Sequence, residues 1–186
     1  METKTIDLTA LSEPIEPRWR IQSVKGNKAV CVPYLDARAV HERLDIVVGR
    51  ANWQNTYDAE SGVASIGIKI DEEWIWKSDV GTESNVEKIK GKASDAFKRA
   101  AVLWGIGRDL YFIGTKTLDS AEGKYAKTAK GQILYTGDQL TNYINGINES
   151  TALLMQIVKQ NSHLNEQVEY KDHVKGLLEI LKTQGV

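Results

Sequence analysis

The sequence predicts an α+β fold, in which a β-hairpin and a helix come before an antiparallel three-stranded meander that packs on a long helix. Two patterns support this prediction. Short runs of alternating apolar and polar residues are separated by connections of two or three residues, which is typical of antiparallel strands that follow one another. Two longer stretches repeat their apolar residues at helical spacing. The chain has 186 residues, 41% of them hydrophobic, and a chain of this size can bury such a core without covalent cross-links.

The first elements begin after an irregular start. Residues 1–17 contain two prolines and no periodicity, which predicts a flexible N-terminal segment. Alternating runs on both sides of residues 25–28, "KGNK", predict a hairpin, because Gly and Asn tolerate the positive φ of a tight turn. Residues 35–50 then predict a helix that Asp36 caps and Gly49 ends.

Three strand-like runs follow the first helix. They lie at 51–59, 63–70 and 73–80, and their short connections predict an antiparallel meander. A second helix is predicted from about Val86 to Trp104, because its apolar residues recur every three or four positions.

The elements from the hairpin to the second helix are expected to form one core domain over residues 18–118. A loop and a helical C-terminal region are expected at 119–186. Residues 114–132 are rich in Gly, Lys, Thr and Ser, which predicts an exposed loop or a loose hairpin. The stretches 136–161 and 165–184 have helical periodicity and predict two or three helices.

Basic charge is concentrated in the second helix, although the whole chain has a net charge of only -1. Residues 88–108 contain six basic side chains and one acidic side chain. On a helical wheel Lys88, Lys92 and Arg99 lie nearly opposite the apolar face, and Lys98 lies beside that row. The row suits the phosphates of a nucleic-acid strand laid along the helix. The alternative is the solvated outer face of an ordinary surface helix.

A longer motif surrounds these cations. "DVGTESN" is followed by "EKIKGKASDAFKRAAVLWGIGRDLY", and upstream "YLDARAVHERLDIVVGRANW" places a Gly and a strand Trp after a helix. Together these stretches resemble the signature of the Rad fifty-two/twenty-two family of single-strand annealing proteins, in its phage and bacterial branch of Sak and DdrA types. The resemblance covers about Trp19 to Tyr111. The matching positions are Gly49, Trp53, Asp79, Val80, Gly81, Asp95, Lys98, Arg99, Ala100, Gly105 or Gly107, Leu110 and Tyr111.

This resemblance implies a protein that binds single-stranded DNA and anneals complementary strands without ATP, in homologous recombination and DNA repair. It implies no enzymatic activity, no cofactor and no metal. The family's beta-beta-beta-alpha core assembles into homo-oligomeric rings or filaments, with single-stranded DNA in a basic groove around the outside. The implied partners are single-stranded DNA, further copies of the chain, and an exonuclease or a single-strand binding protein.

The resemblance also assigns residues to the groove. By position, Lys98 and Arg99 correspond to the family's groove-lining basic pair. Two positions depart from the family: Val102 stands where other members have a further arginine, and Ala39 stands where they have a basic residue on the preceding helix. The expected DNA-binding residues are Lys88, Lys92, Lys98 and Arg99, with Arg38 or Arg43 supplying the contact from the preceding helix.

The same residues leave other functions open. Within DNA metabolism the alternative is a recombination mediator or a DNA-end protection protein, and a metal-dependent nuclease or a nonenzymatic scaffold is the alternative of another class. The three consecutive acids at 71–73 are more typical of a solvated turn than of a metal site. "IGTKT" lacks the adjacent Gly-Lys of a phosphate-binding loop. Trp74 and Trp76 alternate on one strand, which favours core packing over stacking on bases.

The expected location is the cytoplasm of a bacterial or phage-infected cell, in association with the nucleoid. Cys31 is the only cysteine, so no intramolecular disulfide can form, and a reducing compartment fits best. The first 17 residues are polar and acidic without an apolar signal region, and no run reaches the roughly 18 apolar residues of a membrane span. No membrane partner is expected.

Overall fold

The computed structural model describes residues 6–82, 88–160, 172, 174–177 and 179. The fold is α+β, as the sequence predicts. The chain forms two compact units, which we call unit 1 (residues 1–16 and 35–113) and unit 2 (17–34 and 114–186). Each unit has its own antiparallel sheet.

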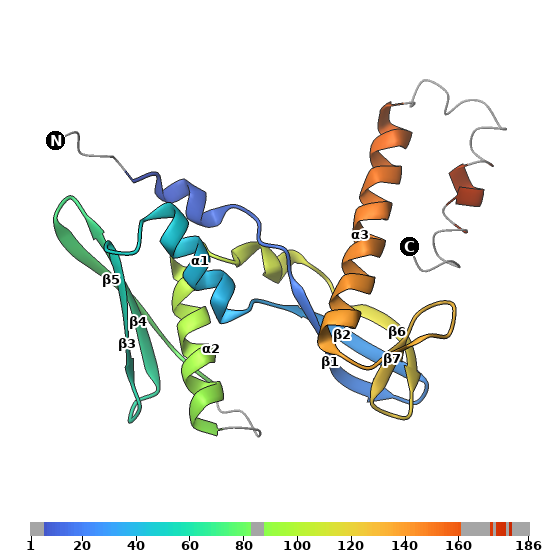
Figure 1. Ribbon diagram of the computed structural model, residues 1–186, viewed down its shortest axis with the longest axis horizontal. Helices are drawn as coiled ribbons and strands as arrows, with labels where there is room; N and C mark the ends of the chain where they lie inside the picture. The colour runs from blue at the N-terminus through green and yellow to red at the C-terminus, as the bar shows by residue number, and fades with distance from the viewer. Residues whose placement is uncertain (1–5, 83–87, 161–171, 173, 178, 180–186) are drawn as a thin grey trace. The chain divides into compact units, whose positions relative to one another are not determined.

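Unit 1 contains the predicted meander and both predicted helices (Figure 1). Its strands pair in the order β3-β4-β5, and every strand is antiparallel to its neighbour. The elements are the 3-10 helix η1 (Leu8–Ser12), α1 (Ala37–Val47), β3 (Trp53–Asp58), β4 (Val63–Ile70), β5 (Glu73–Val80), α2 (Lys88–Leu103) and the 3-10 helix η2 (Arg108–Phe112).

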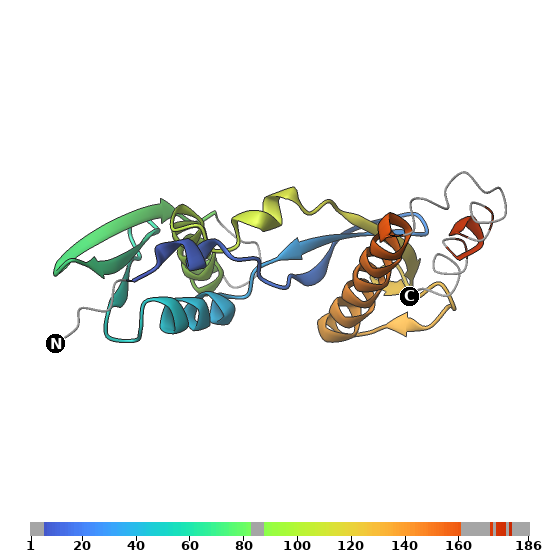
Figure 2. The same cartoon turned by 90° about the horizontal axis from the view of Figure 1, so that it is seen from above.

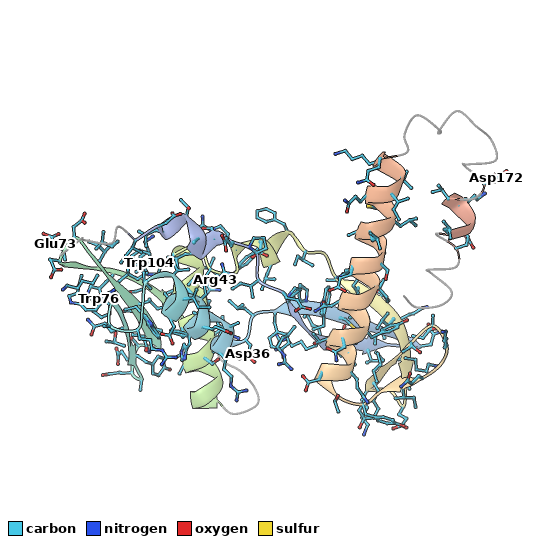
Figure 3. The ribbon with its side chains drawn as sticks, turned by 45° about the horizontal axis from the view of Figure 1, so that its top comes forward. Asp36, Arg43, Glu73, Trp76, Trp104 and Asp172 are labelled. Atoms are coloured by element: carbon cyan, nitrogen blue, oxygen red, sulfur yellow. The ribbon has the colours of Figure 1, made fainter. Side chains whose placement is uncertain are left out.

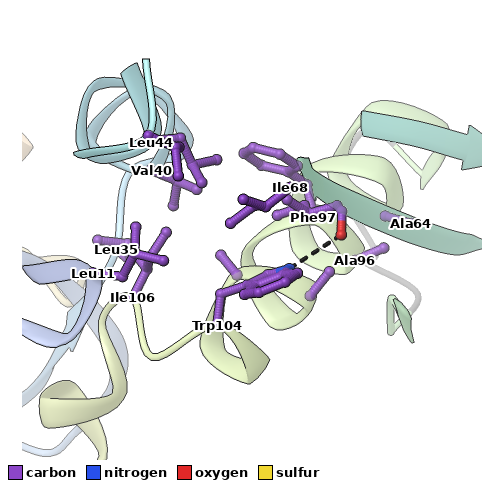
Figure 4. Packing of buried hydrophobic residues seen from close by; sticks show 14 residues of the cluster. Leu11, Leu35, Val40, Leu44, Ala64, Ile68, Ala96, Phe97, Trp104 and Ile106 are labelled. Carbon is purple, nitrogen blue, oxygen red and sulfur yellow. Dashed lines mark hydrogen bonds between the residues drawn. The ribbon is translucent and has the colours of Figure 1, made fainter. Parts of the chain in front are cut away.

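One face of the meander forms the core of unit 1 together with α1 and α2 (Figure 4). The middle strand contributes Ile66 and Ile68, which are fully buried, and α2 contributes Phe97. Trp104 directly follows the last residue of α2, and its indole Nε1 donates a hydrogen bond of 3.1 Å to the carbonyl oxygen of Ile66. Strand and helix are therefore joined by a buried polar contact as well as by apolar packing.

The N-terminal segment differs from the flexible one expected. Residues of η1 pack on the core, where Leu11 is fully buried. The guanidinium of Arg43 on α1 donates hydrogen bonds to the backbone carbonyls of Ala10, Glu13 and Pro14 at 2.9, 2.7 and 3.1 Å. Ile6, Leu8 and Ile15 pack against the same core. These apolar contacts and the distant arginine order residues 6–16, and they produce no periodic pattern there.

The tryptophans of β5 were expected in the core, and this expectation is wrong. Trp74 and Trp76 are 38% and 42% exposed. Trp76 lies on the face of the meander that α2 does not cover (Figure 3), and Trp74, two residues earlier on the strand, shares that face. Their strand neighbours on the covered face pair with Ile66 and Ile68 instead. Gly67 lies opposite Trp76, and a Cβ at Gly67 would be 2.9 Å from the indole ring. The large ring fits flat on the sheet because that position has no side chain.

Unit 2 combines the predicted hairpin with residues that follow unit 1 in the sequence. Its sheet has the order β1-β2-β6-β7-β8, and Figure 2 shows α3 lying against this sheet. The hairpin is confirmed. Residues 114–132 were expected as an exposed loop or a loose hairpin, and two of their segments pair as an antiparallel hairpin that extends this sheet. The elements are β1 (Arg18–Lys25), β2 (Lys28–Tyr34), β6 (Lys116–Ala121), β7 (Tyr125–Lys127), β8 (Ile133–Leu134) and α3 (Gly137–Gln160). The division into 1–17, 18–118 and 119–186 as functional parts stays a prediction.

A buried polar contact joins α3 to the first strand. The backbone N–H of Trp19 donates to Oγ1 of Thr141 at 2.9 Å, and its indole Nε1 donates to Oδ1 of Asn145 at 2.8 Å. The Asn145 side chain in turn donates to the carbonyl oxygen of Pro17 at 3.1 Å. The further helical stretch predicted at 165–184 lies mostly outside the described residues.

Candidate nucleic-acid interface

Helix α2 directs its two central cations in different directions. Successive helix residues are about 100° apart, so Lys98 and Arg99 leave the helix at well-separated angles. Both are partly buried. Leu103 belongs to the apolar residues that recur along this helix, and yet it is 41% exposed. Among the helix residues whose burial the structure describes, Ala96, Phe97, Ala100 and Ala101 are buried, and so is Trp104 directly after the helix.

Arg99 contacts an acidic residue near the end of strand β5. Its Nη2 donates to Oδ1 of Asp79 at 3.4 Å and lies 3.3 Å from Oδ2. The two side chains are 41% and 26% exposed, and pairs this exposed contribute at most about 1 kcal/mol to stability. A guanidinium has five N–H donors, so this contact leaves others for a second anion.

The chain just after β5 is fitted closely to α2. The carboxylate of Asp95 accepts hydrogen bonds from the backbone N–H and the hydroxyl of Thr82, both at 3.0 Å. Gly81 is buried, and a Cβ there would lie 2.3 Å from the carbonyl oxygen of Lys92. Asp79, Gly81 and Asp95 all belong to the motif found in the sequence, and in this chain they hold β5 on α2.

The remaining cations of the predicted row lie nearer the start of α2. Lys92 extends across the turn between β3 and β4, where a Cβ at Gly62 would overlap its Cε and Nζ atoms. Lys88 begins the helix, and its side chain lies outside the described part of the chain. Lys98 makes no hydrogen bond or ion pair with the described residues. Among the lysines of α2 whose side chains the structure describes, Lys98 and Lys92 both have an ammonium that no hydrogen bond or ion pair to the described residues occupies.

The two arginines predicted on α1 are used differently. Arg43 points to the N-terminal segment and donates to three of its backbone carbonyls (Figure 3). Because this role occupies its guanidinium, we leave Arg43 out of the proposed DNA contacts. Arg38 lies in the first turn of α1 and is exposed.

A further cation at the other end of α2 was missed by the sequence analysis. Lys77 on β5 donates from Nζ to the carbonyl oxygen of Leu103 at 2.9 Å. The same Nζ lies 4.1 Å from the centre of the Trp104 ring. A cation at a helix C-terminus stabilises the helix dipole, and one over an aromatic face gains a further attraction. The only local signal was a lysine at an inward position of a strand.

The acidic residues at 71–73 form the turn between β4 and β5. Asp71 and Glu72 have positive φ values of 48° and 66°, and Glu72 pairs with Lys69. Among the described residues, no three His, Cys, Asp or Glu side chains gather as they would around a metal ion. Within the same residues, no helix has the length and apolar character needed to span a bilayer.

The fold and this arrangement define an α+β protein whose basic helix is fastened to an antiparallel meander. The chain is similar to the single-stranded DNA-binding protein DdrA of Deinococcus radiodurans, with 36% identity over 93 residues, which is 48% of this chain and 44% of that protein. It is also similar to the protein of the same name from Deinococcus deserti, with 35% identity over 89 residues, 46% of this chain and 44% of that protein. The chain thus matches less than half the length of these relatives. No protein-family model and no solved structure matches it.

Proposed function

We propose that this protein binds single-stranded DNA and anneals complementary strands without ATP, in recombination and repair. The observation that supports the proposal most is α2, a helix rich in cations that the residues of the annealing-family motif fasten to the meander. Two relatives named as single-stranded DNA-binding proteins support the same ligand.

The proposed contacts begin with Lys98 and Arg99. Lys98 supplies an ammonium without a competing acid among the described residues. Arg99 keeps donors beyond those that reach Asp79, and its position is fixed by that contact. Lys92, Lys88 and Arg38 complete the proposed set. Contacts to phosphates of this kind hold a strand without reading its sequence.

Annealing follows if the strand is held by its phosphates with the base edges free. A bound strand cannot fold back on itself, and its bases remain open to a complementary strand. Neither step forms or breaks a covalent bond, so neither requires a nucleotide or a catalytic group.

We further propose that the chain works as a ring or filament of identical subunits, with residues 18–118 as the annealing core. One helix offers few phosphate contacts, and affinity for a long strand rises steeply when many subunits bind it together. The proposed setting is the cytoplasm, with an exonuclease or a single-strand binding protein as a further partner.

The test combines Lys98→Ala with Arg99→Ala. We expect affinity for a labelled oligothymidine to fall about tenfold, and the slope of log affinity against log salt to become shallower by about 1.4, since each lost phosphate contact on a single strand accounts for about 0.7. The annealing rate of two complementary oligonucleotides, measured without nucleotide, should fall with it.

The matched control combines Arg50→Ala with Lys159→Ala. It removes the same charge from two exposed positions outside α2. Wild-type affinity and annealing in the Lys98 and Arg99 variant, with an unchanged thermal midpoint, would show that these cations serve solubility only.

A further inference from the structure

The sheet of unit 2 carries a row of charged side chains, three lysines and one aspartate, that crosses four strands. Lys25 lies opposite Lys28, Lys28 lies opposite Asp119, and Asp119 lies opposite Lys127. Residues directly opposite in an antiparallel sheet share a face, so all four side chains are on one side. Neighbouring strands are about 4.8 Å apart, so the row extends over roughly 14 Å.

This face is the one that α3 leaves open. Trp19, Ala29 and Cys31 occupy the alternate positions of the same two strands and are fully buried. Side chains alternate between the faces of a strand, so the row points away from that core. Lys25 and Lys28 are exposed, as this orientation requires.

The row has an excess of positive charge. Its one acid, Asp119, accepts a hydrogen bond of 2.7 Å from Nζ of Lys28. The pKa of Asp119 lies below its usual value because of this hydrogen bond and the charge of Lys28, and the charge of Lys127 adds to the effect. Lys25 forms no ion pair with the residues that the structure describes. Three lysines therefore face one carboxylate.

Aromatic rings lie at both sides of the row. The guanidinium carbon of Arg20 is 5.9 Å from the centre of the Tyr34 ring, and both residues lie on the open face. Tyr125 is two residues before Lys127 on β7 and so shares its face. Surfaces that bind single strands without sequence preference combine cations for phosphates with aromatic or guanidinium planes for bases.

We propose that the open face of the unit 2 sheet is a second surface for single-stranded DNA, separate from α2. The choice of ligand rests on the proposed function, and the charge and aromatic content of the face suit a flexible polyanion with flat bases. The row is wide enough to contact two or more phosphates at once. The surface is formed by β1, β2, β6 and β7. These strands come from the two separate sequence segments of unit 2, so the surface exists only when the two segments have paired.

The test combines Lys25→Ala with Lys127→Ala, which leaves the Lys28 and Asp119 pair in place. We expect affinity for a labelled oligothymidine to fall about fivefold to tenfold, with a salt slope that is shallower by about 1.4. The matched control combines Lys116→Ala with Lys159→Ala. Lys116 lies opposite the buried Cys31, on the other face of the same sheet, so the control removes equal charge from unit 2 and should bind as the wild type does.

The outcomes separate this inference from the proposed function. Failure of the wild type to bind oligothymidine would overturn the proposed function and this inference with it. Binding that falls in the Lys98 and Arg99 variant but not in the sheet variant would overturn only the second surface. If the sheet variant and its control weaken oligothymidine binding equally, the loss is a general effect of charge, and the second surface is overturned. Competition by polyglutamate as strong as by oligothymidine, lost in the sheet variant, would assign the face to an acidic peptide instead.

Discussion

Nη2 of Arg99 lies 3.3 Å from Oδ2 of Asp79, so the arginine proposed to meet a phosphate already has an anion beside it. The carboxylate fixes the side chain and at the same time offsets its charge. A phosphate that approaches Arg99 therefore also meets the negative charge of Asp79, which lowers the net positive charge at this position.

Replacing this carboxylate should strengthen DNA binding. Asp79→Asn keeps a carbonyl oxygen that can accept from Arg99 but removes a negative charge. We expect severalfold tighter binding of oligothymidine and a steeper dependence on salt, since one more cation is free to replace counterions. Glu60→Gln, an equal charge change in the exposed turn between β3 and β4, is the control. Weaker binding by Asp79→Asn would mean that the charge of Asp79 is needed to position Arg99.

The glycine that follows β5 should be essential for stability. In Gly81→Ala the new Cβ would meet the Lys92 carbonyl oxygen at 2.3 Å and the Ala96 nitrogen at 3.0 Å, so β5 must move from α2. We expect a loss of about 1–3 kcal/mol, measured by denaturant unfolding. Gly114→Ala, where a Cβ would meet no atom within 4 Å, should leave the free energy of unfolding nearly unchanged. Equal stability of the two variants would contradict the packing described.

The buried amide of α3 should stabilise unit 2 through its partners. Asn145→Leu leaves the indole N–H of Trp19 and the carbonyl oxygen of Pro17 without this side chain. Since an unsatisfied buried polar group costs about 1–3 kcal/mol, we expect a loss of that size and an altered tryptophan emission spectrum. Asn142→Leu, at an exposed position of the same helix, is the control and should have little effect.

The single cysteine should make stability depend on alkaline pH. Burial raises the pKa of the Cys31 thiol from 9.0 to about 11. The unfolded chain ionises first as pH rises, so this contribution is complete below about pH 9 and is lost between pH 9 and 11, by roughly 1.4 kcal/mol per pH unit. The difference in unfolding free energy between wild type and Cys31→Ala should show this fall. The native thiol should also react slowly with a disulfide reagent at pH 8.

The order of elements was predictable because each has a local signal. Alternation and short connections identified the meander, and Asp36 and Gly49 identified the limits of α1. The pairing of β2 with β6 had no such signal, since Lys28 and Asp119 are 91 residues apart. Tertiary contacts of this range depend on the whole chain and leave no periodicity in either segment.

The candidate site was predictable only as a set of charges. The wheel identified the cations of α2, but not that Arg99 meets Asp79 on a separate strand. Nor could it show that Arg43 would bind backbone carbonyls. Every residue has a backbone carbonyl, so such a partner cannot be recognised from the residue types in a sequence. Nor could the sequence show whether Trp74 and Trp76 lie on the buried or the exposed face of the meander. Alternation assigns them to one face, but it does not say which face a helix covers.

The same long-range pairing bears on how the protein is synthesised. A ribosome adds about 5–20 residues per second, so the 91 residues between Lys28 and Asp119 take roughly 5–18 s. During that interval β2 has an unpaired edge, which is a template for pairing with another chain. Residues 35–113 emerge within the same interval, so the meander and its helices can fold on the nascent chain while the sheet of unit 2 still lacks its later strands.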